Sequence, residues 1–163
     1  MPGGGSSFRN PPRRATLGEA GSSPQPRVLL VEDDPDRIRL SEHAIETASA
    51  KCELEAVETG RDALARLDEG SPAAFDLVLL DLDLPDVSGH EVCAEIRSQV
   101  APSEVPVVVL TSSEEEDDVR ASYEAGANSH VAKAVDYQTF REDLAGILSY
   151  WLDVNQTVPS STL

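Results

Sequence analysis

The segment DLVLLDLDLP, residues 76–85, decides the fold of this 163-residue chain. Its four apolar residues, Leu77–Leu80, are bounded by Asp76 and Asp81. An unbroken apolar run of this length is typical of a strand that is covered on both faces, as the strands of a parallel sheet are. The segment therefore predicts a central strand of an α/β sheet, with acidic residues directly after it.

Short apolar runs and longer amphipathic stretches alternate on both sides of this segment, which predicts five repeated βα units. The expected strands are residues 28–31, 52–57, 77–80, 105–110 and 129–132, and the expected helices are 35–49, 60–68, 90–100, 114–125 and 137–153. Asp34 and Pro35 suit the start of the first helix, and Gly126 suits the end of the fourth. Right-handed crossovers then give a three-layer, doubly wound domain with a five-stranded parallel sheet.

The composition excludes two classes of partner. Thirty Asp and Glu against thirteen Lys and Arg give a formal charge of −17, which argues against nucleic acid and anionic membranes as partners. No apolar run approaches the ~20 residues of a membrane span, and no secretion signal is recognisable. We therefore expect a cytoplasmic protein, in which Cys52 and Cys93 are reduced, inert thiols.

The charge is unevenly distributed along the chain. Residues 1–26 are rich in Pro and Gly and hold three arginines and one glutamate, so this segment carries +2 and the remainder −19. Such a composition predicts a disordered N-terminal arm. Residues 27–153 are expected to form one folded domain, followed by a short C-terminal tail over residues 154–163.

Chemically reactive side chains follow four of the five predicted strands. Because the carboxyl ends of parallel strands form the ligand crevice of such sheets, these residues should converge. Clustered carboxylates repel one another and need a cation, and all-oxygen ligands favour Mg²⁺. A hydroxyl and an ammonium beside that ion would bind a phosphoryl group. The residues are Glu32, Asp33 and Asp34 after the first strand, Asp81 and Asp83 after the third, Thr111, Ser112 and Ser113 after the fourth, and Lys133 after the fifth.

Each group also has a simpler explanation. The acids at 32–34 form a polar turn that ends in a helix cap, and Asp81 merely closes a strand. Thr111 caps the next helix in a Thr-x-x-Glu box with Glu114, and Lys133 is a surface lysine. Their joint occurrence at consecutive strand ends favours the phosphoryl site.

Four segments resemble the successive motifs of the response-regulator receiver domain, over residues 27 to about 150. They are LLVEDDPDRIRL (29–40), DLVLLDLDLPDVSG (76–89), VVVLTSS (107–113) and GANSHVAKAVD (126–136). The resemblance implies a (βα)₅ flavodoxin-like receiver fold. The segments VDYQTF and ILSYWLDVNQTVP are further similar to stand-alone regulators that are paired with bacterial and cyanobacterial phytochromes.

The resemblance implies a role for each site residue. Asp81 would accept a phosphoryl group from a phosphohistidine on a sensor histidine kinase, which the narrower resemblance suggests is a phytochrome. Mg²⁺ would be held by Glu32, Asp33, Asp81 and the backbone carbonyl of Asp83. Thr111 and Lys133 would bind the phosphoryl oxygens, and the small Ser112 would leave room for them. The protein would assist its own phosphorylation and dephosphorylation without being a conventional enzyme.

Three positions depart from the family pattern. Ala134 follows Lys133 where the family usually has a cis-proline, so either the loop is strained or Lys133 lies differently. His130 occupies the place of an aromatic packing switch and brings a group that can change charge near neutral pH, unless it is only a half-exposed spacer. The Asp83 side chain adds a carboxylate near the phosphorylation site.

The last helix suggests how a signal could leave the domain. About ten residues follow it, so we expect the output to be a partner protein, a changed oligomer or onward phosphotransfer. Its broad apolar stripe predicts a homodimer through the helix at 114–125, the strand at 129–132 and the last helix, although the stripe is also explained as core. The stripe comprises Leu144, Ile147, Leu148, Trp151 and Leu152.

Two other functions remain open from the residues. One is a receiver-like interaction module that works without phosphorylation, which the Ala134 departure favours. The other is a Mg²⁺-dependent phosphatase of a small substrate, because an aspartate nucleophile with Mg²⁺ also serves that chemistry. A flavin site is excluded because carboxylates occupy the first loop, where a phosphate would bind.

Overall fold

The structure is a computed structural model that describes residues 25–48, 51–70 and 72–159. The predicted disordered arm lies outside the described residues up to position 24, as do the expected end of the first helix at Ser49 and the last four residues of the chain. None of the helices in the described part is long and apolar enough to cross a membrane.

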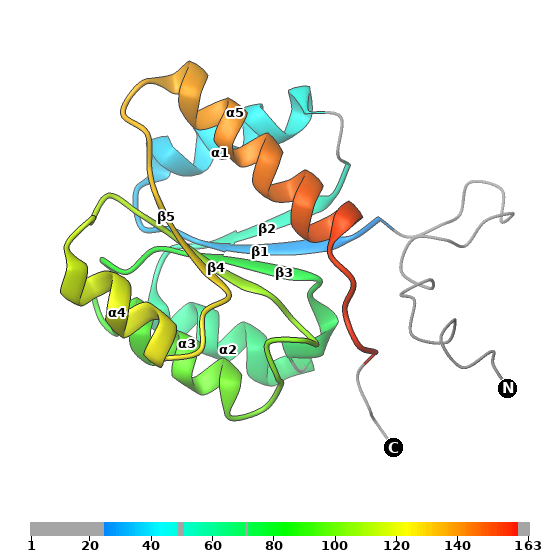
Figure 1. Ribbon diagram of the computed structural model, residues 1–163, viewed down its shortest axis with the longest axis vertical. Coiled ribbons are helices and arrows are strands. Elements are labelled where there is room, and N and C mark those ends of the chain that lie inside the picture. Colours follow the sequence, from blue (N-terminus) through cyan, green and yellow to red (C-terminus); the bar gives the residue numbers. More distant parts are fainter. Residues whose placement is uncertain (1–24, 49–50, 71, 160–163) are drawn as a thin grey trace, which may run out of the picture.

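Five parallel strands form one sheet in the order β2-β1-β3-β4-β5 (Figure 1). Their bounds are β1 Arg27–Val31, β2 Glu53–Val57, β3 Leu77–Leu80, β4 Val107–Thr111 and β5 Ser129–Ala132. The predicted doubly wound sheet with the flavodoxin-like order is therefore confirmed. β4 begins two residues later than expected, where Pro106 lacks the N–H that a strand residue donates.

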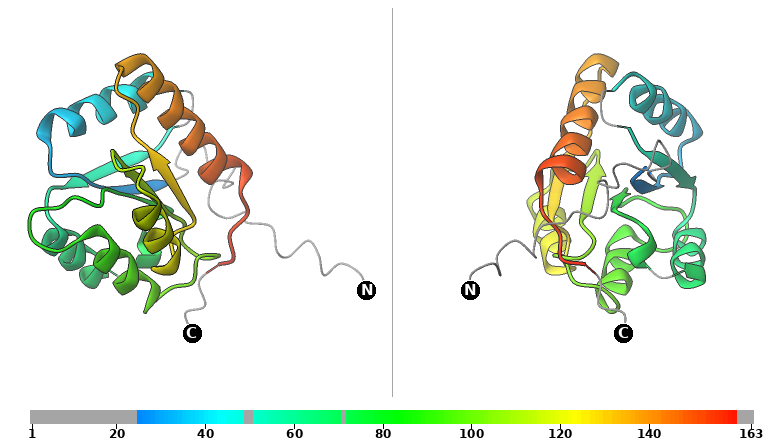
Figure 2. Two further views of the ribbon diagram at one scale, coloured as in Figure 1. Left: turned by 60° about the vertical axis from the view of Figure 1, so that its left-hand side comes forward. Right: turned by 90° about the vertical axis from the view of Figure 1, so that its right-hand side faces the viewer.

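Helices cover both faces of this sheet. They are α1 Pro35–Thr47, α2 Gly60–Gly70, α3 Gly89–Arg97, α4 Glu116–Glu124 and α5 Tyr137–Leu148, with a 3₁₀ turn at Pro72–Ala74. Figures 1 and 2 show α1 and α5 on one face and α2, α3 and α4 on the other. α5 continues as a π-helix over Ser149–Val154, so the predicted length of the last helix is right but its hydrogen bonding changes.

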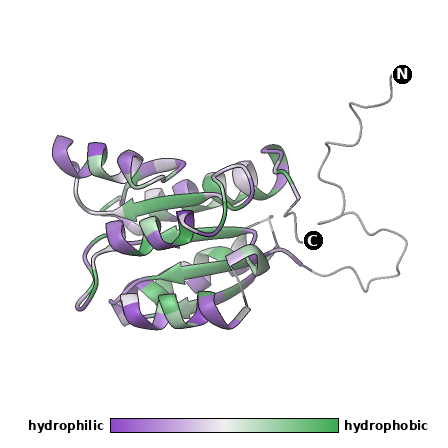
Figure 3. Cartoon of the chain, turned by 90° about the horizontal axis from the view of Figure 1, so that it is seen from below, coloured by the Kyte–Doolittle hydropathy of each residue, from purple (hydrophilic) through white to green (hydrophobic). Residues whose placement is uncertain are grey.

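The core follows from the alternation of side chains along the strands. Val28 and Leu30 of β1 pack toward α1 and α5, whereas Leu29 and Val31 pack toward α2 and α3. All four residues of β3 are completely buried, as expected of a central strand. Figure 3 shows the result, with hydrophobic strands between helices whose outer faces are hydrophilic.

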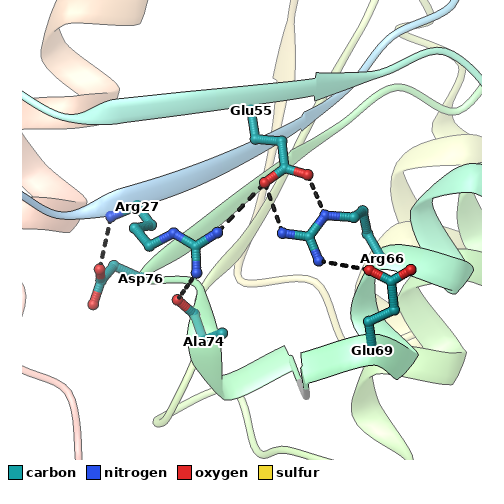
Figure 4. A network of polar contacts seen from close by, with 6 residues as sticks. All are labelled: Arg27, Glu55, Arg66, Glu69, Ala74 and Asp76. Carbon is teal, nitrogen blue, oxygen red and sulfur yellow. Dashed lines mark hydrogen bonds and ion pairs between the residues drawn. The ribbon is translucent and has the colours of Figure 1, made fainter.

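Ionic contacts fasten the edge strand β2 on the α2 side of the sheet (Figure 4). Glu55 of β2 accepts hydrogen bonds from Arg27 of β1 at 3.4 Å and from Arg66 of α2 at 2.8 Å. The hydrogen bonds from Arg66 hold the pKa of the Glu55 carboxyl below its ordinary value. Both guanidinium groups lie over the Phe75 ring, at 4.8 and 5.5 Å from its centre. The network thereby joins β1, β2 and α2.

The chain after the π-helix turns back along the domain. The Asn155 amide donates to the Tyr150 carbonyl at 2.7 Å, and the Val158 amide donates to the Ser103 carbonyl at 2.8 Å. Thr157 between them is only 3% exposed. Residues 155–158 of the expected tail therefore lie against the loop that precedes β4.

Both cysteines are free thiols, as expected. Cys93 is buried in α3, and its sulfur lies 3.5 Å from the Ala125 carbonyl oxygen. Cys52 is half-buried, and burial raises the pKa of its thiol to about 11. A thiol with so high a pKa is almost fully protonated at neutral pH and reacts slowly.

Candidate functional site

The strand ends place the polar residues predicted from the sequence at one edge of the sheet. The backbone pairing continues one residue past the strands, because the Glu32 amide donates to Val57 and the Asp81 amide donates to Val31, both at 3.0 Å. The Lys133 amide likewise donates to the Thr111 carbonyl at 2.8 Å. The backbone of each of these residues is therefore fixed by a neighbouring strand.

Three carboxylates meet at this edge. Carboxylate oxygens of Glu32, Asp33 and Asp81 lie within 4.8 Å of one another. Glu32 and Asp81 are buried, at 4% and 6% exposure, whereas Asp33 is exposed. These oxygen donors, without an imidazole or thiolate in the cluster, fit a hard divalent cation such as Mg²⁺. Asp83 is exposed, and its side chain is not part of the cluster.

Lys133 supplies the positive charge in this cluster. Its Nζ donates to Glu32 Oε1 at 2.6 Å and to Asp81 Oδ2 at 3.3 Å, and its side chain is 7% exposed. The explanation of Lys133 as a surface residue is therefore wrong. Burial raises the pKa of Glu32, and the hydrogen bond and charge of Lys133 act in the opposite direction.

Ala134 does not displace the lysine. The described residues contain no cis peptide bond, so the Lys133–Ala134 bond is trans. The Lys133 side chain nevertheless reaches both buried carboxylates. Of the two alternatives that Ala134 raised, a strained loop or a differently placed Lys133, the second is therefore not met.

The two capping hypotheses have different outcomes. Asp34 is the N-cap of α1, and its Oδ1 accepts from the Asp36 amide at 2.9 Å. Thr111 is not a cap, because it ends β4 and the N-cap residue of α4 is Glu115. α4 also begins two residues later than expected, since Ser113 Oγ accepts from the Glu115 amide and holds this segment as a loop.

Thr111 lies at the end of the strand beside the carboxylates. It is completely buried, and its Oγ1 accepts from the Ser113 amide at 3.4 Å. No hydrogen bond joins it to the three carboxylates in the described residues. Ser112 is exposed. His130 lies outside the carboxylate cluster and contacts Ser122 and the Ser113 carbonyl instead.

The loop between β3 and α3 is held by residues that sequence reasoning did not assign to the site. The Asp86 carboxylate accepts from the Gly60 and Arg61 amides at 2.8 and 3.0 Å, and so caps α2. Partial burial raises the pKa of Asp86, but backbone hydrogen bonds outweigh it and hold this pKa below its ordinary value. A Cβ at Gly89 would lie 2.3 Å from the Asp81 carbonyl oxygen. Pro85 and Gly89 predict a loop at this place in the sequence. Nothing in the sequence predicts the contacts that hold this loop.

The expected dimer residues divide into two groups. Leu144 and Leu148 are at most 1% exposed and pack in the core on the α1 and α5 side of the sheet. Ile147 and Trp151 are half-buried, and Tyr150 beside them is 47% exposed. Tyr150 and Trp151 make an edge-to-face contact, with ring centres 4.9 Å apart. A partner can therefore reach Ile147 and Trp151 of the stripe, together with the neighbouring Tyr150.

Comparison with known proteins identifies relatives over most of the chain. The sequence model described as "Response regulator receiver domain" matches residues 28–145. Response regulator Rcp1 of Synechocystis sp. is 39% identical over 145 residues, which are 86% of this chain and 97% of that protein.

Solved structures agree with this match. The phosphorylated cyanobacterial phytochrome response regulator RcpA has a TM-score of 0.73 at 36% identity, and the match covers 83% of this chain and 99% of that one. The Mn²⁺-bound form of Rcp1 has a TM-score of 0.72 at 39% identity, over 84% of this chain and all of that one.

Proposed function

The chain belongs to the response regulator receiver domain family, and from this premise we propose that Asp81 accepts a phosphoryl group from a sensor histidine kinase. The observation that carries the proposal is the buried contact of Lys133 with Asp81 and Glu32, next to the exposed carboxylate of Asp33. A phosphoryl acceptor needs a carboxylate oxygen beside positive charge, and this arrangement supplies both.

Each residue of the site has its own role in the proposed phosphoryl transfer. An Asp81 oxygen attacks phosphorus in line, while the bond from phosphorus to the kinase imidazole breaks. Mg²⁺ held by Glu32, Asp33, Asp81 and the Asp83 carbonyl would neutralise charge on the transferred group. Lys133 binds a phosphoryl oxygen, and the Thr111 hydroxyl donates a hydrogen bond once it turns toward the group. Transfer of this kind depends on positioning and charge neutralisation more than on a strong base.

The relatives support the finer parts of the proposal. RcpA is a phosphorylated cyanobacterial phytochrome response regulator, and Rcp1 has a Mn²⁺-bound form. We therefore infer a divalent cation, with Mg²⁺ the natural occupant, and a phytochrome-type kinase as the phosphodonor. A cytoplasmic location follows from the same proposal, because such phosphotransfer takes place there.

A homodimer is the proposed route of output, through α4, β5 and α5. Tyr123 on α4 is 51% exposed and Tyr150 after α5 is 47% exposed, and large aromatic residues often anchor interfaces. Tyr150→Asp and Tyr123→Asp should each shift the protein from dimer to monomer in light scattering after size exclusion. Leu40→Asp, at an exposed position of α1, is the control and should leave the dimer intact.

Mass spectrometry tests the phosphoacceptor. Acetyl phosphate with Mg²⁺ should add one phosphoryl group to the wild type and to Asp83→Asn, and none to Asp81→Asn. An absent gain in the wild type, or an equal gain in Asp81→Asn, would contradict the proposal.

The same preparation separates the two alternatives. Turnover of many equivalents of a small phosphate ester per protein would favour the phosphatase. Partner binding that needs no phosphorylation and survives Asp81→Ala would favour the interaction module.

A further inference from the structure

The loop between β3 and α3 is shaped by backbone hydrogen bonds of its own. The Leu84 and Gly89 amides both donate to the Leu82 carbonyl, each at 3.1 Å. The bond from Leu84 spans two residues and makes a γ-turn centred on Asp83. The Asp83 amide donates to Asp81 Oδ1 at 3.3 Å, so this turn contacts the proposed phosphoacceptor. These bonds fix the shape of the loop, but they do not attach it to the rest of the domain.

The Asp86 side chain makes that attachment. Its Oδ1 accepts from the Gly60 amide at 2.8 Å and its Oδ2 accepts from the Arg61 amide at 3.0 Å, at the first two residues of α2. Oδ1 also accepts from the Val87 amide of the loop at 2.8 Å. In the part of the chain that the structure describes, every hydrogen bond between residues 82–88 and a segment outside residues 81–97 ends on Asp86.

Close packing brings the loop against the same end of α2. A Cβ at Gly60 would lie 2.8 Å from Val87 Cβ and 2.9 Å from the Val87 carbonyl oxygen, so a larger residue there would have to displace the loop. Leu84 and Val87 pack against the core on the α2 and α3 side of the sheet. α2 begins shortly after β2 ends, at the pole of the sheet where the three carboxylates meet. The loop is therefore fastened to α2 beside the candidate site.

Asp86 is not itself a further ligand of the carboxylate cluster. Its two oxygens accept three amide protons, and the Arg61 guanidinium lies 3.6 Å from Oδ2. The partial positive charge at the start of a helix also stabilises a carboxylate there. Among the described residues, the cluster consists of Glu32, Asp33 and Asp81. Asp86 can therefore affect a bound cation only by placing other atoms of the loop.

We propose that Asp86 is a positioning residue for the cation, because it fastens the loop to α2 and thereby holds the Asp83 carbonyl in place as a ligand of Mg²⁺. The inference rests on the proposed Mg²⁺ site and extends it to a residue outside that site. Removal of a group that orients a metal ligand typically weakens metal binding by about 10–100-fold. Asp86→Ala leaves every carboxylate of the cluster in place, and it should weaken Mg²⁺ binding by about tenfold.

Calorimetric titration with Mg²⁺ measures the dissociation constant, and urea midpoints in EDTA measure the stability of the same proteins. The matched control is Thr59→Ala. Thr59 Oγ1 accepts from the Asp62 amide at 2.9 Å, so this variant removes a cap of the same helix and leaves the bonds of Asp86 intact. Both variants should lower the urea midpoint, but only Asp86→Ala should raise the dissociation constant. Gly60→Ala keeps Asp86 but displaces the loop, and it should raise the dissociation constant as well.

The Mg²⁺ dependence of phosphorylation by acetyl phosphate gives a second readout. In Asp86→Ala, the Mg²⁺ concentration that gives half of the maximal rate should rise about tenfold. The maximal rate should stay within about twofold of the wild type, because saturating Mg²⁺ fills the same site. Asp86→Asn keeps one acceptor oxygen, so its dissociation constant should lie between those of the wild type and Asp86→Ala.

The outcomes separate this inference from the proposed function. Equal dissociation constants in the wild type and Asp86→Ala contradict the positioning role. An equal rise in Thr59→Ala also contradicts it, because the effect would then come from helix capping alone. A wild type that binds Mg²⁺ but takes up no phosphoryl group contradicts the proposed function of Asp81, and the calorimetry still decides the role of Asp86. A wild type that binds no Mg²⁺ contradicts the metal site, and the inference with it.

Discussion

Lys133 lies closer to Glu32 than to Asp81, with Nζ 2.6 Å from Glu32 Oε1 and 3.3 Å from Asp81 Oδ2. The cation beside the proposed phosphoacceptor is therefore shared with a proposed metal ligand. All three side chains are at most 7% exposed, so water screens their charges only weakly. Two buried carboxylates thus depend on one ammonium group.

Removal of this ammonium should be costly for folding. Lys133→Met leaves two buried carboxylates unpaired and should lower the free energy of unfolding by about 3 kcal/mol at neutral pH in EDTA. Urea denaturation measures this change in the free energy of unfolding. Mg²⁺ should restore part of the loss, because it replaces the missing positive charge. Lys51→Met, at an exposed position, is the control and should change stability by less than about 0.5 kcal/mol; an equal loss in both variants would refute the pairing.

Mg²⁺ should stabilise the folded protein. At a concentration about 100 times its dissociation constant, a ligand specific for the folded state raises the free energy of unfolding by about 2.7 kcal/mol. Asp33→Ala should remove most of this gain without loss of packing, because Asp33 is exposed. Asp83→Ala should keep it, because only its backbone carbonyl is proposed as a ligand. Thermal melts with Mg²⁺ and with EDTA compare the variants, and a gain retained in Asp33→Ala would exclude the cluster as the binding site.

Two glycines should respond in opposite ways to alanine. At Gly89, a Cβ would lie 2.3 Å from the Asp81 carbonyl oxygen and 2.7 Å from Leu82 Cα, so backbone must move. Gly89→Ala should cost about 1–3 kcal/mol of stability and slow phosphorylation of Asp81. At Gly146 in α5, no atom lies within 4 Å of the added Cβ, and Gly146→Ala should add about 0.5–1 kcal/mol. Urea denaturation of both variants is the measurement, and equal effects would contradict the close approach.

Glu55 should contribute to stability in a pH-dependent way. Hydrogen bonds from Arg66 hold the pKa of Glu55 below its ordinary 4.5 in the folded protein. The unfolded chain then takes up a proton first as pH falls, so the contribution is present above that ordinary pKa and is lost as pH falls through the folded-state value. Glu55→Gln should flatten this part of the stability profile, measured as urea midpoints across the acidic range. Glu42→Gln, at an exposed position of α1, should leave the profile unchanged.

The strands and the polar residues at their ends could be predicted because their signals are local. The Leu77–Leu80 run and the acids around it define the central strand, and βα alternation then places Asp81 and Lys133 at the same edge. The contact of Lys133 with Glu32 crosses 101 positions, and no periodicity encodes which carboxylate the ammonium prefers. The sequence could therefore predict that carboxylates and Lys133 gather at this edge, but neither which carboxylates belong to the cluster nor how they pair.

Other features escaped prediction because they depend on packing between elements. Ser122 and His90 contact each other from different helices, 32 residues apart in the chain, and neither stands out from the composition around it. α4 begins later than predicted because Ser113 makes side-chain hydrogen bonds, which helix propensities do not take into account. The apolar stripe on the last helix could be predicted from the sequence. Which of its residues are buried and which are accessible depends on how α5 crosses the sheet.

The hydrogen bond between Val158 and Ser103 has a practical consequence for handling the protein. Ser103 lies before β4 and Arg27 begins β1, so the first and the last described elements both reach the amino ends of the strands. The carboxylates lie at the carboxyl ends, on the opposite pole of the domain. A reporter or a surface tether attached at this pole would therefore lie away from Asp81 and leave the opposite end of the domain accessible to the proposed kinase.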